Sequence, residues 1–128
     1  MTAWLSAEWF DRVRALASEL PARPGLTARI QQQITGGPDG DLVCHWMLED
    51  GRPMSAALGT LDAPDVTLSL SWSDAAAIQS GALDPGVAFM QGRMKVAGSM
   101  AVVMELLPAA REPGGQDLRR RVAELTEF

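Results

Sequence analysis

The segment that decides the fold is Asp65–Leu107, which reads DVTLSLSWSDAAAIQSGALDPGVAFMQGRMKVAGSMAVVMELL. Aliphatic and hydroxyl residues alternate through Val66–Ser71, a pattern typical of a strand with one buried face. A short Ala-rich helix should follow, capped by Ser73 and ended by Gly81. Asp84, directly before a proline, marks the start of another helix. The first half of the segment therefore predicts a strand followed by two small helices.

The second half of the segment predicts a strand and an apolar helix. Arg93–Ala97 alternates in character between two glycines, and Ser99 can then cap the helix. The apolar residues of this helix repeat at helical spacing, at Met100, Val103, Met104 and Leu107. Further aliphatic residues widen its apolar surface, which predicts a helix covered on more than one side and stopped by Pro108.

The chain before this segment predicts one helix and three strands. A helix capped by Ser6 is expected over residues 6–20, where apolar residues recur at helical spacing. From Thr27 the period changes to two, and glycine-containing turns separate strands near 27–34, 42–49 and 52–58. With the two later strands, this pattern predicts an α/β (α+β) fold: a largely antiparallel twisted sheet of about five strands with helices on one face.

The C-terminal residues predict a spacer and a last helix. Residues 109–115 are rich in glycine and proline, whereas 116–127 return to helical spacing. Arg119–Arg121 could meet phosphate head groups, but such a run is more often a solvated helix face. A permanently docked helix is favoured over the alternative, a lid over a binding site. The whole chain, 1–128, is predicted to form one domain with its core in 27–107.

Composition predicts a soluble globular protein. Of its 128 residues, 47% are hydrophobic and 21% charged, and the net charge of −5 argues against the basic face that nucleic-acid binding requires. No apolar run approaches the roughly 20 residues of a membrane span, and the N-terminus does not resemble a signal peptide. The lone cysteine, Cys44, fits a reducing compartment. We therefore expect a cytoplasmic protein without nucleic-acid partners or stable membrane insertion.

The sequence offers no recognisable catalytic or cofactor-binding constellation. The single histidine, His45, adjoins Cys44 on a predicted strand, so the two side chains point to opposite faces and cannot pair as base and nucleophile. A zinc site needs more ligands than these two. The glycine-rich turn at residues 36–40 lacks the lysine of a phosphate-binding loop. We predict a protein that is not an enzyme and has no catalytic residue, metal ligand or cofactor.

Part of the deciding segment resembles a known family. Its succession of Gly81, a proline turn and the run Ala88–Gly98 (AFMQGRMKVAG) before a Met-rich helix is similar to the sterol carrier protein type two (SCP-2) family. The resemblance extends from Thr27 to about Leu107 and is most specific from Gly81 to Met104. Ser99 stands where the family often has aspartate, but serine caps a helix equally well, so the expected fold is unchanged.

The resemblance implies an SCP-2-like fold with an apolar tunnel between sheet and helices. Methionine suits such a tunnel, because its flexible side chain adapts to ligands of varied shape. The implied lipid-binding residues are apolar side chains of the deciding segment: Leu68, Leu70, Ile78, Phe89, Met90, Met94, Val96, Met100, Val103, Met104 and Leu107. Their spacing alone favours a simpler interpretation, in which they fill a core, and only the resemblance favours the tunnel.

Three functions stand as hypotheses. The first, which the resemblance favours, is non-catalytic binding and transfer or presentation of an apolar lipid, fatty-acyl or isoprenoid/sterol-like. The second is an accessory or dimerisation module, with a homodimer or a partner enzyme as its target. The third is an enzyme acting on a hydrophobic substrate, for which the sequence shows no evident acid or base.

Overall fold

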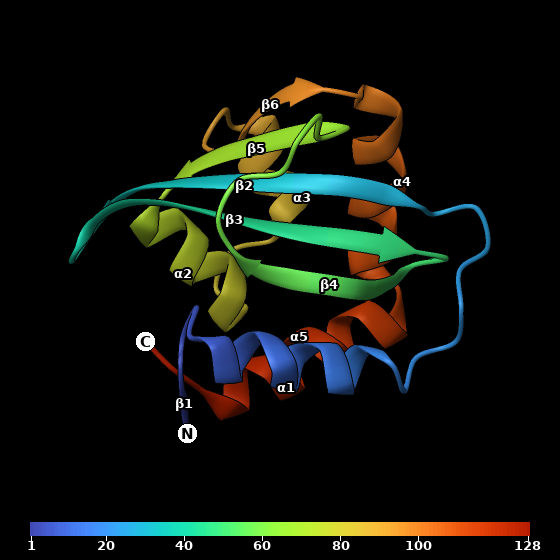
Figure 1. The fold of residues 1–128 in the computed structure, drawn as a ribbon, viewed down its shortest axis with the longest axis horizontal. Coiled ribbons are helices and arrows are strands. Elements are labelled where there is room, and N and C mark those ends of the chain that lie inside the picture. The colour runs from blue at the N-terminus through green and yellow to red at the C-terminus, as the bar shows by residue number, and fades with distance from the viewer.

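A five-stranded mixed sheet forms the centre of the computed structural model, which describes residues 1–128 (Figure 1). The strands are β2 (Ala28–Gly37), β3 (Gly40–Glu49), β4 (Arg52–Leu58), β5 (Val66–Ser71) and β6 (Lys95–Gly98). They lie in the order β4-β3-β2-β5-β6, and each neighbouring pair is antiparallel except β2 and β5, which run parallel. The prediction of a largely antiparallel five-stranded sheet is confirmed.

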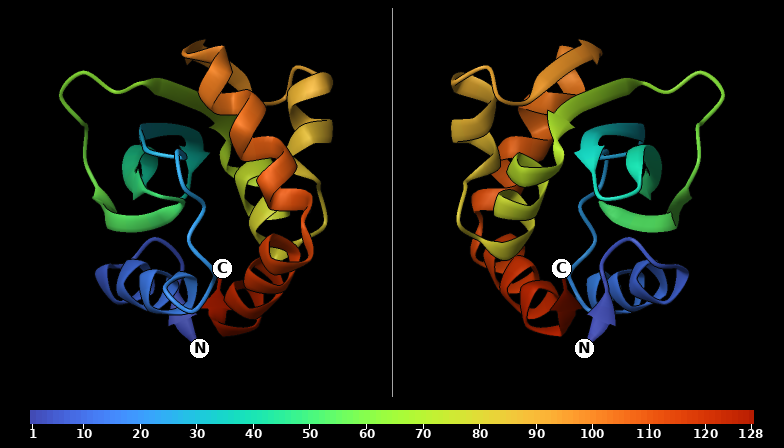
Figure 2. Two further views of the ribbon diagram at one scale, coloured as in Figure 1. Left: turned by 90° about the vertical axis from the view of Figure 1, so that its right-hand side faces the viewer. Right: turned by 90° about the vertical axis from the view of Figure 1, so that its left-hand side faces the viewer.

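Five helices accompany the sheet: α1 (Ala7–Ala17), α2 (Trp72–Ser80), α3 (Pro85–Met90), α4 (Met100–Arg111) and α5 (Pro113–Leu125). Figure 2 shows α2, α3 and α4 on one side of the sheet and α1 below its β4 edge. Helix α1 packs on β4, and α5 contacts α1, α2 and α4. This arrangement places helices from both halves of the chain against the inner face and the β4 edge of the sheet.

Side-chain caps set where most of the helices begin. Ser6, Asp84 and Ser99 each accept a hydrogen bond from a backbone N–H in the first turn of α1, α3 and α4, as predicted. The cap of α2 is Ser71 rather than Ser73, because β5 leads directly into the helix without a loop. Ser71 Oγ accepts a hydrogen bond from the Asp74 backbone N–H at 3.1 Å.

The inner face of the sheet carries large apolar side chains. Ile30 of β2 lies opposite Trp46 of β3 and Val66 of β5, so these three side chains point to the same side. The Trp46 ring packs against the rings of Trp9 and Phe10 of α1, with centroids 6.0 and 5.5 Å apart. Trp9 and Phe10 are only 1% and 2% exposed, which places the centre of the core between the sheet and α1.

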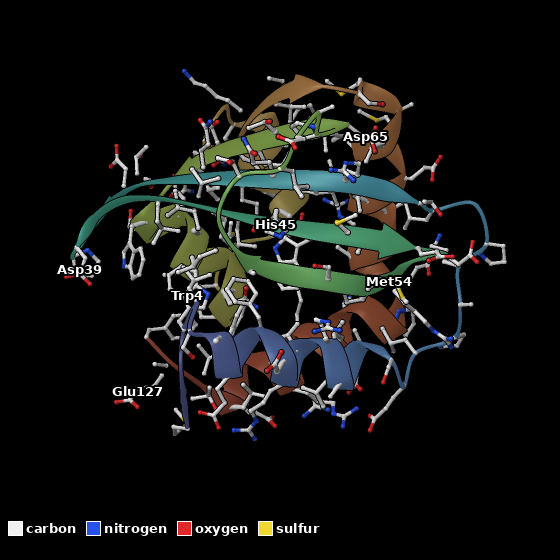
Figure 3. All side chains as sticks on the ribbon, in the orientation of Figure 1. Trp4, Asp39, His45, Met54, Asp65 and Glu127 are labelled. Carbon is white, nitrogen blue, oxygen red and sulfur yellow. The ribbon has the colours of Figure 1, made fainter.

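The outer face of the sheet is crossed by the connection from β4 to β5, residues 59–65, which passes over β3 and β2 in Figure 1. Polar side chains of the two strands hold this connection. Gln31 Oε1 accepts a hydrogen bond from the Leu61 backbone N–H at 2.9 Å. His45, labelled in Figure 3, has its Nδ1 atom 2.9 Å from the Gly59 carbonyl oxygen. His45 therefore supports a loop on the side of the sheet opposite the core.

The two ends of the chain pair with each other, which the sequence did not predict. Strand β1 (Thr2–Ala3) runs parallel to β7 (Thr126–Glu127). The Trp9 indole N–H donates to Thr126 Oγ1 at 2.8 Å, and Thr126 is 2% exposed. Strands of two residues are too short to show an alternating pattern, so only the tertiary structure reveals them.

Helix α4 differs from its prediction in two respects. It continues through Pro108 to Arg111, because a proline near the helix end removes one backbone donor, and the carbonyl left free belongs to Met104, an exposed residue. Val103 is 1% exposed, whereas Met100 and Met104 are 45% and 53% exposed. The prediction of a helix covered on more than one side is therefore wrong.

Several element boundaries also shift. Helix α5 begins at Pro113, since proline is well suited to the first helical position, and the predicted spacer 109–115 reduces to Glu112 between two helices. The last helix thus spans 113–125 instead of 116–127. Helix α1 ends at Ala17, and the strand expected from Arg93 begins at Lys95.

Candidate functional site

A cavity of about 260 Å³ lies between the inner face of the sheet and helices α1, α2 and α4. Sixteen residues line it, and thirteen of them are hydrophobic. They are Trp4, Leu5, Trp9, Gln32, Ile34, Trp46, Leu68, Leu70, Ala75, Ile78, Gln79, Pro85, Met94, Leu106, Leu107 and Ala110. None of these side chains carries a charge, so the cavity is suited to an uncharged ligand or part of a ligand.

Larger hollows on the surface have a different character. The hollow between Ser80 and Glu124 measures about 480 Å³, but only one of its seven lining residues is hydrophobic. Another, between the connection after α1 and the start of α5, reaches about 620 Å³, with eight of seventeen lining residues hydrophobic. Both are more open to solvent than the cavity. The smaller, mostly apolar cavity is therefore the better candidate for a binding site.

The cavity is assembled from several elements, most of which are distant from one another in sequence. The inward positions of β2 and β5 supply residues such as Ile34 and Leu70, while α2 supplies Ala75. Leu107 comes from α4. The N-terminal residues complete the enclosure, and Leu5 enters it with φ of 65°, a left-handed conformation that is uncommon for leucine.

Gln32 is one of two glutamines that line this mostly apolar cavity. It occupies an inward position of β2, two residues from Ile34, and lines the cavity. Its Oε1 accepts a hydrogen bond from the Trp46 indole N–H at 2.9 Å and another from the Cys44 thiol at 3.3 Å. Cys44 is fully buried, and burial raises the pKa of its thiol to about 12. Cys44 is thus a neutral donor rather than a nucleophile at neutral pH.

Ion pairs outside the cavity hold its helices in place. The Arg93 guanidinium lies 2.6 Å from Asp74 of α2, and Arg111 at the end of α4 lies 2.9 Å from Asp84, the cap of α3. The hydrogen bond from Arg93 lowers the pKa of Asp74, and that from Arg111 lowers the pKa of Asp84. Both carboxylates therefore stay ionised to lower pH than a free aspartate does.

The structure places the eleven predicted lipid-binding residues in three settings. Five line the cavity: Leu68, Leu70, Ile78, Met94 and Leu107. Val103 is buried in the core, and Phe89 and Val96 pack against that core while partly buried. Met90, Met100 and Met104 are exposed, Met90 by 84%. The helical spacing of the methionines indicated a helix correctly but could not show which of its stripes faces inward.

Sequence reasoning missed the part of the cavity contributed by the first half of the chain. Trp4, Leu5 and Trp9 reach it only because the chain ends meet at β1 and β7. Gln32 did leave a signal, since a glutamine stands at an inward position of an otherwise apolar alternation. A polar residue in such a position is typically held by hydrogen bonds.

The C-terminal helix does not cover the cavity in this structure. Its apolar residues Leu118, Val122 and Leu125 belong to or pack against the core, and none of them lines the cavity. Arg120 pairs with Asp117 and Glu124, and Arg121 pairs with Glu19. The arrangement agrees with a docked helix in which Arg120 and Arg121 are engaged in surface ion pairs.

No group of three or more His, Cys, Asp or Glu side chains is arranged to hold a metal ion. None of the helices combines the length and the apolar character needed to cross a bilayer.

Comparison with known sequences finds one family and a set of related proteins. The family model described as the SCP-2 sterol transfer family matches residues 10–111. Sterol carrier protein 2 of Homo sapiens is 29% identical over 87 residues, which are 67% of this chain and 16% of that protein. Sterol carrier protein 2 of Gallus gallus is 30% identical over 84 residues, 64% of this chain and 15% of that protein. The chain therefore matches about one sixth of the length of these relatives.

Solved structures share the fold. The crystal structure of a sterol carrier protein 2 superposes with a TM-score of 0.70 at 16% identity, covering 94% of this chain and 98% of that one. The solution structure of palmitated SCP2L2 from Aedes aegypti gives a TM-score of 0.65 at 21% identity, covering 84% and 96%. A sec-alkylsulfatase from a Pseudomonas species contains a similar portion, with a TM-score of 0.54 at 22% identity over 78% of this chain and 15% of the sulfatase.

The family match and the fold lead to the same assignment. The family model covers most of the chain, including the whole sheet and the helices α2, α3 and α4. The motif in Gly81–Gly98 that first indicated the family lies inside the matched region. The chain belongs to the SCP-2 sterol transfer family.

Proposed function

We propose that this protein binds an apolar lipid reversibly in the cavity and carries, presents or transfers it without altering it. The observation that supports the proposal is the cavity itself: about 260 Å³, with thirteen hydrophobic residues among the sixteen that line it. Such a site would bind by removing apolar ligand surface from water, at about 25 cal/mol per Å² before the costs of association. Selectivity among hydrocarbon chains should accordingly be loose.

The volume of the cavity limits the size of the ligand that it can hold. Ligand pockets commonly measure about 300–1,000 Å³, so the cavity lies just below this range. We propose a fatty-acyl or isoprenoid-like chain, part of which occupies the cavity as it stands. A bulkier ligand, such as a sterol, would require the surrounding helices to move outwards.

The chemistry of the lining residues supports transport rather than catalysis. Among the sixteen residues there is no carboxylate, imidazole, amine, thiol or phenol. Acid–base and nucleophilic catalysis both need such a group within reach of the bound substrate. His45 lies against Gly59 on the outer side of the sheet, and Cys44 holds its proton at neutral pH.

Native mass spectrometry of the freshly purified protein tests this function. We expect a population whose excess mass corresponds to a noncovalently retained lipid, released when the protein is denatured. Organic extraction of the same sample should recover the lipid unmodified. A protein that carries no lipid, and that takes up none from added long-chain ligands, would contradict the proposal.

An accessory or dimerisation role is a second candidate, favoured by one observation. Met90, Met100 and Met104 are exposed on α3 and α4, two helices that contact each other. Exposed apolar side chains of this kind commonly mark contact surfaces. Light scattering after size-exclusion chromatography would reveal a homodimer, and substitution of these three residues by glutamine should then restore the monomer mass.

The proposed cellular compartment rests on Cys44. Cys44 is unpaired and buried, and an unpaired thiol is compatible with the reducing cytoplasm that we propose as the location. We propose that any contact with membranes is transient and made through surface residues.

A further inference from the structure

We infer that the Gln32 side-chain amide is the polar anchor of the cavity and donates a hydrogen bond to an uncharged oxygen of the bound lipid. This inference rests on the proposed lipid-binding function and narrows its ligand class. The ligand would be a chain bearing an ester or ketone carbonyl, or a hydroxyl group, rather than a bare hydrocarbon or an ionised fatty acid.

The orientation of the amide is fixed by its neighbours. An indole N–H only donates, so the Gln32 atom 2.9 Å from Trp46 Nε1 must be the oxygen. The Cys44 thiol supplies a second donor to the same oxygen at 3.3 Å. Because Cys44 has its pKa raised to about 12, this donor keeps its proton throughout the physiological range. The two contacts occupy both lone pairs of Oε1.

The amide nitrogen is left with its two N–H groups and no protein acceptor. Gln32 takes part in two side-chain hydrogen bonds, and both are made by its oxygen. The side chain lines the cavity at an inward position of β2, surrounded there by residues such as Leu68 and Ile34. Gln32 is partly buried, and its amide N–H groups can donate to an oxygen of a ligand that enters the cavity.

Gln79 also lines the cavity, but it does not offer the same preorganisation. It lies near the C-terminal end of α2, and no hydrogen bond fixes the direction of its amide. A donor already oriented by two neighbours loses less conformational freedom when it binds a ligand. Of the two glutamines that line the cavity, Gln32 is therefore the one to which we assign polar recognition.

The residues lining the cavity carry no charge, which favours a neutral oxygen of the ligand over a carboxylate as the hydrogen-bond acceptor. No Lys, Arg or His is among its lining residues, and Arg93 and Arg111 are engaged with Asp74 and Asp84. A carboxylate placed beside Gln32 would lose its hydration without gaining a cation, which is strongly unfavourable. A neutral carbonyl or hydroxyl oxygen loses far less and gains the same hydrogen bond.

The test compares three probes with sixteen-carbon chains: hexadecane, methyl palmitate, and palmitate at pH 8. Each displaces diphenylhexatriene, a hydrocarbon fluorophore, from the wild-type protein. We expect the ester to bind about five- to tenfold more tightly than the alkane, the gain typical of one net hydrogen bond. The ionised acid should bind more weakly than the ester.

Two variants test whether the preference for the ester over the alkane depends on Gln32. In Gln32→Met the ratio of ester to alkane affinity should fall to about one. Gln33→Met is the matched control, because Gln33 is the next residue of β2 and is exposed on the opposite side of the sheet. In Gln33→Met the preference for the ester should persist. Loss of the preference in Gln33→Met, or its survival in a folded Gln32→Met, would overturn the assignment.

A measurement on the wild-type protein keeps the test independent of the variants. In ¹⁵N-labelled protein, the Gln32 side-chain NH₂ signals should move downfield when methyl palmitate is added and should stay near their free positions with hexadecane. If no probe binds at all, the proposed function fails. If the probes bind equally, or if ionised palmitate binds most tightly, lipid binding stands and the Gln32 inference is wrong.

Discussion

At the scale of single residues, Cys44 shows that the surroundings of a side chain determine whether it is reactive. A free cysteine is a candidate nucleophile in any sequence, yet here its side chain is 0% exposed and donates to Gln32 Oε1. Burial raises its pKa from 9.0 to about 12. The thiol therefore donates a hydrogen bond to Gln32, which lines the cavity, and does not act as a nucleophile.

The raised pKa predicts how stability depends on pH. Between pH 9 and 12 the unfolded chain loses the Cys44 proton and the folded chain keeps it, so unfolding becomes more favourable as pH rises. The contribution of Cys44 is fully present below pH 9 and is lost above it at about 1.4 kcal/mol per pH unit. Urea denaturation of wild type and Cys44→Ser between pH 7 and about 10.5 measures this difference.

The serine variant is the control, because other groups also titrate in this range. We expect its free energy of unfolding to fall less steeply above pH 9 than that of wild type. Identical pH profiles would show that Cys44 is not protonated in the folded state as described. Rapid alkylation of the native protein by iodoacetamide at pH 7.5 would lead to the same conclusion.

At the scale of elements, the sequence predicted those parts whose signal is local. The strands alternate in residue character over four or more positions, and serine or aspartate caps mark the starts of α1, α3 and α4. Pro108 was misleading, because its cost depends on where the released carbonyl lies, which is a tertiary property. The pairing of β1 with β7 left no trace in the sequence at all.

Gly98 at the end of β6 illustrates a requirement imposed by strand pairing. Its φ is 105°, and a Cβ atom at this position would lie 2.5 Å from the Asp65 carbonyl oxygen. We expect Gly98→Ala to lower the free energy of unfolding by about 2–4 kcal/mol, since both backbone strain and a backbone clash are introduced. Urea denaturation of the variant checks this value.

Gly92→Ala is the matched control for this substitution. Gly92 also has a positive φ, 73°, but no atom lies within 4 Å of the position a Cβ would take. Its variant should lose only about 1 kcal/mol, the cost of the left-handed conformation alone. Equal losses at the two positions would mean that the close approach of β6 to Asp65 is not a constraint.

At the scale of the whole molecule, the structure is closed by contacts between its two ends. Helix α5 is anchored by Val122, which is 2% exposed, and by the hydrogen bond from the Trp9 indole to Thr126. These contacts hold the N-terminal residues, including Trp4 and Leu5, against the cavity. The ends of the chain thus help to form the candidate binding site.

Thr126→Val should therefore destabilise the protein. It leaves the buried Trp9 N–H without an acceptor, at a cost of about 1–3 kcal/mol, which corresponds to a fall of several degrees in Tm. Thr35→Val is the control, because Thr35 is exposed on β2. Calorimetry of both variants provides the measurement.

The same variant distinguishes a docked C-terminal helix from a lid. A docked helix predicts that Thr126→Val lowers Tm, whereas a lid would open more readily without affecting the rest of the fold. Unchanged Tm together with faster exchange of a fluorescent lipid would contradict the docked arrangement and favour the lid.

Much of the cavity escaped prediction because it is a property of the assembled molecule. Leu68, Leu70 and Ile78 were identified because strand alternation and helix spacing both point them inward. Trp4 and Leu107 are about a hundred residues apart in sequence, and nothing local relates them. The sequence period shows which residues share one face of a helix or strand. It does not show which other element packs against that face.

The central claim is that the cavity is the lipid-binding site, and filling it provides the most direct test. Ala75 of α2 lines the cavity and is 7% exposed, whereas Ala15 of α1 is exposed at the surface. Equilibrium titration of a fluorescent long-chain lipid into wild type, Ala75→Leu and Ala15→Leu compares their dissociation constants, with Tm as the check on folding. We predict at least about tenfold weaker binding for a folded Ala75→Leu, about 1.4 kcal/mol or more, and no change for Ala15→Leu. Unchanged binding by Ala75→Leu would contradict the claim that lipid occupies this cavity.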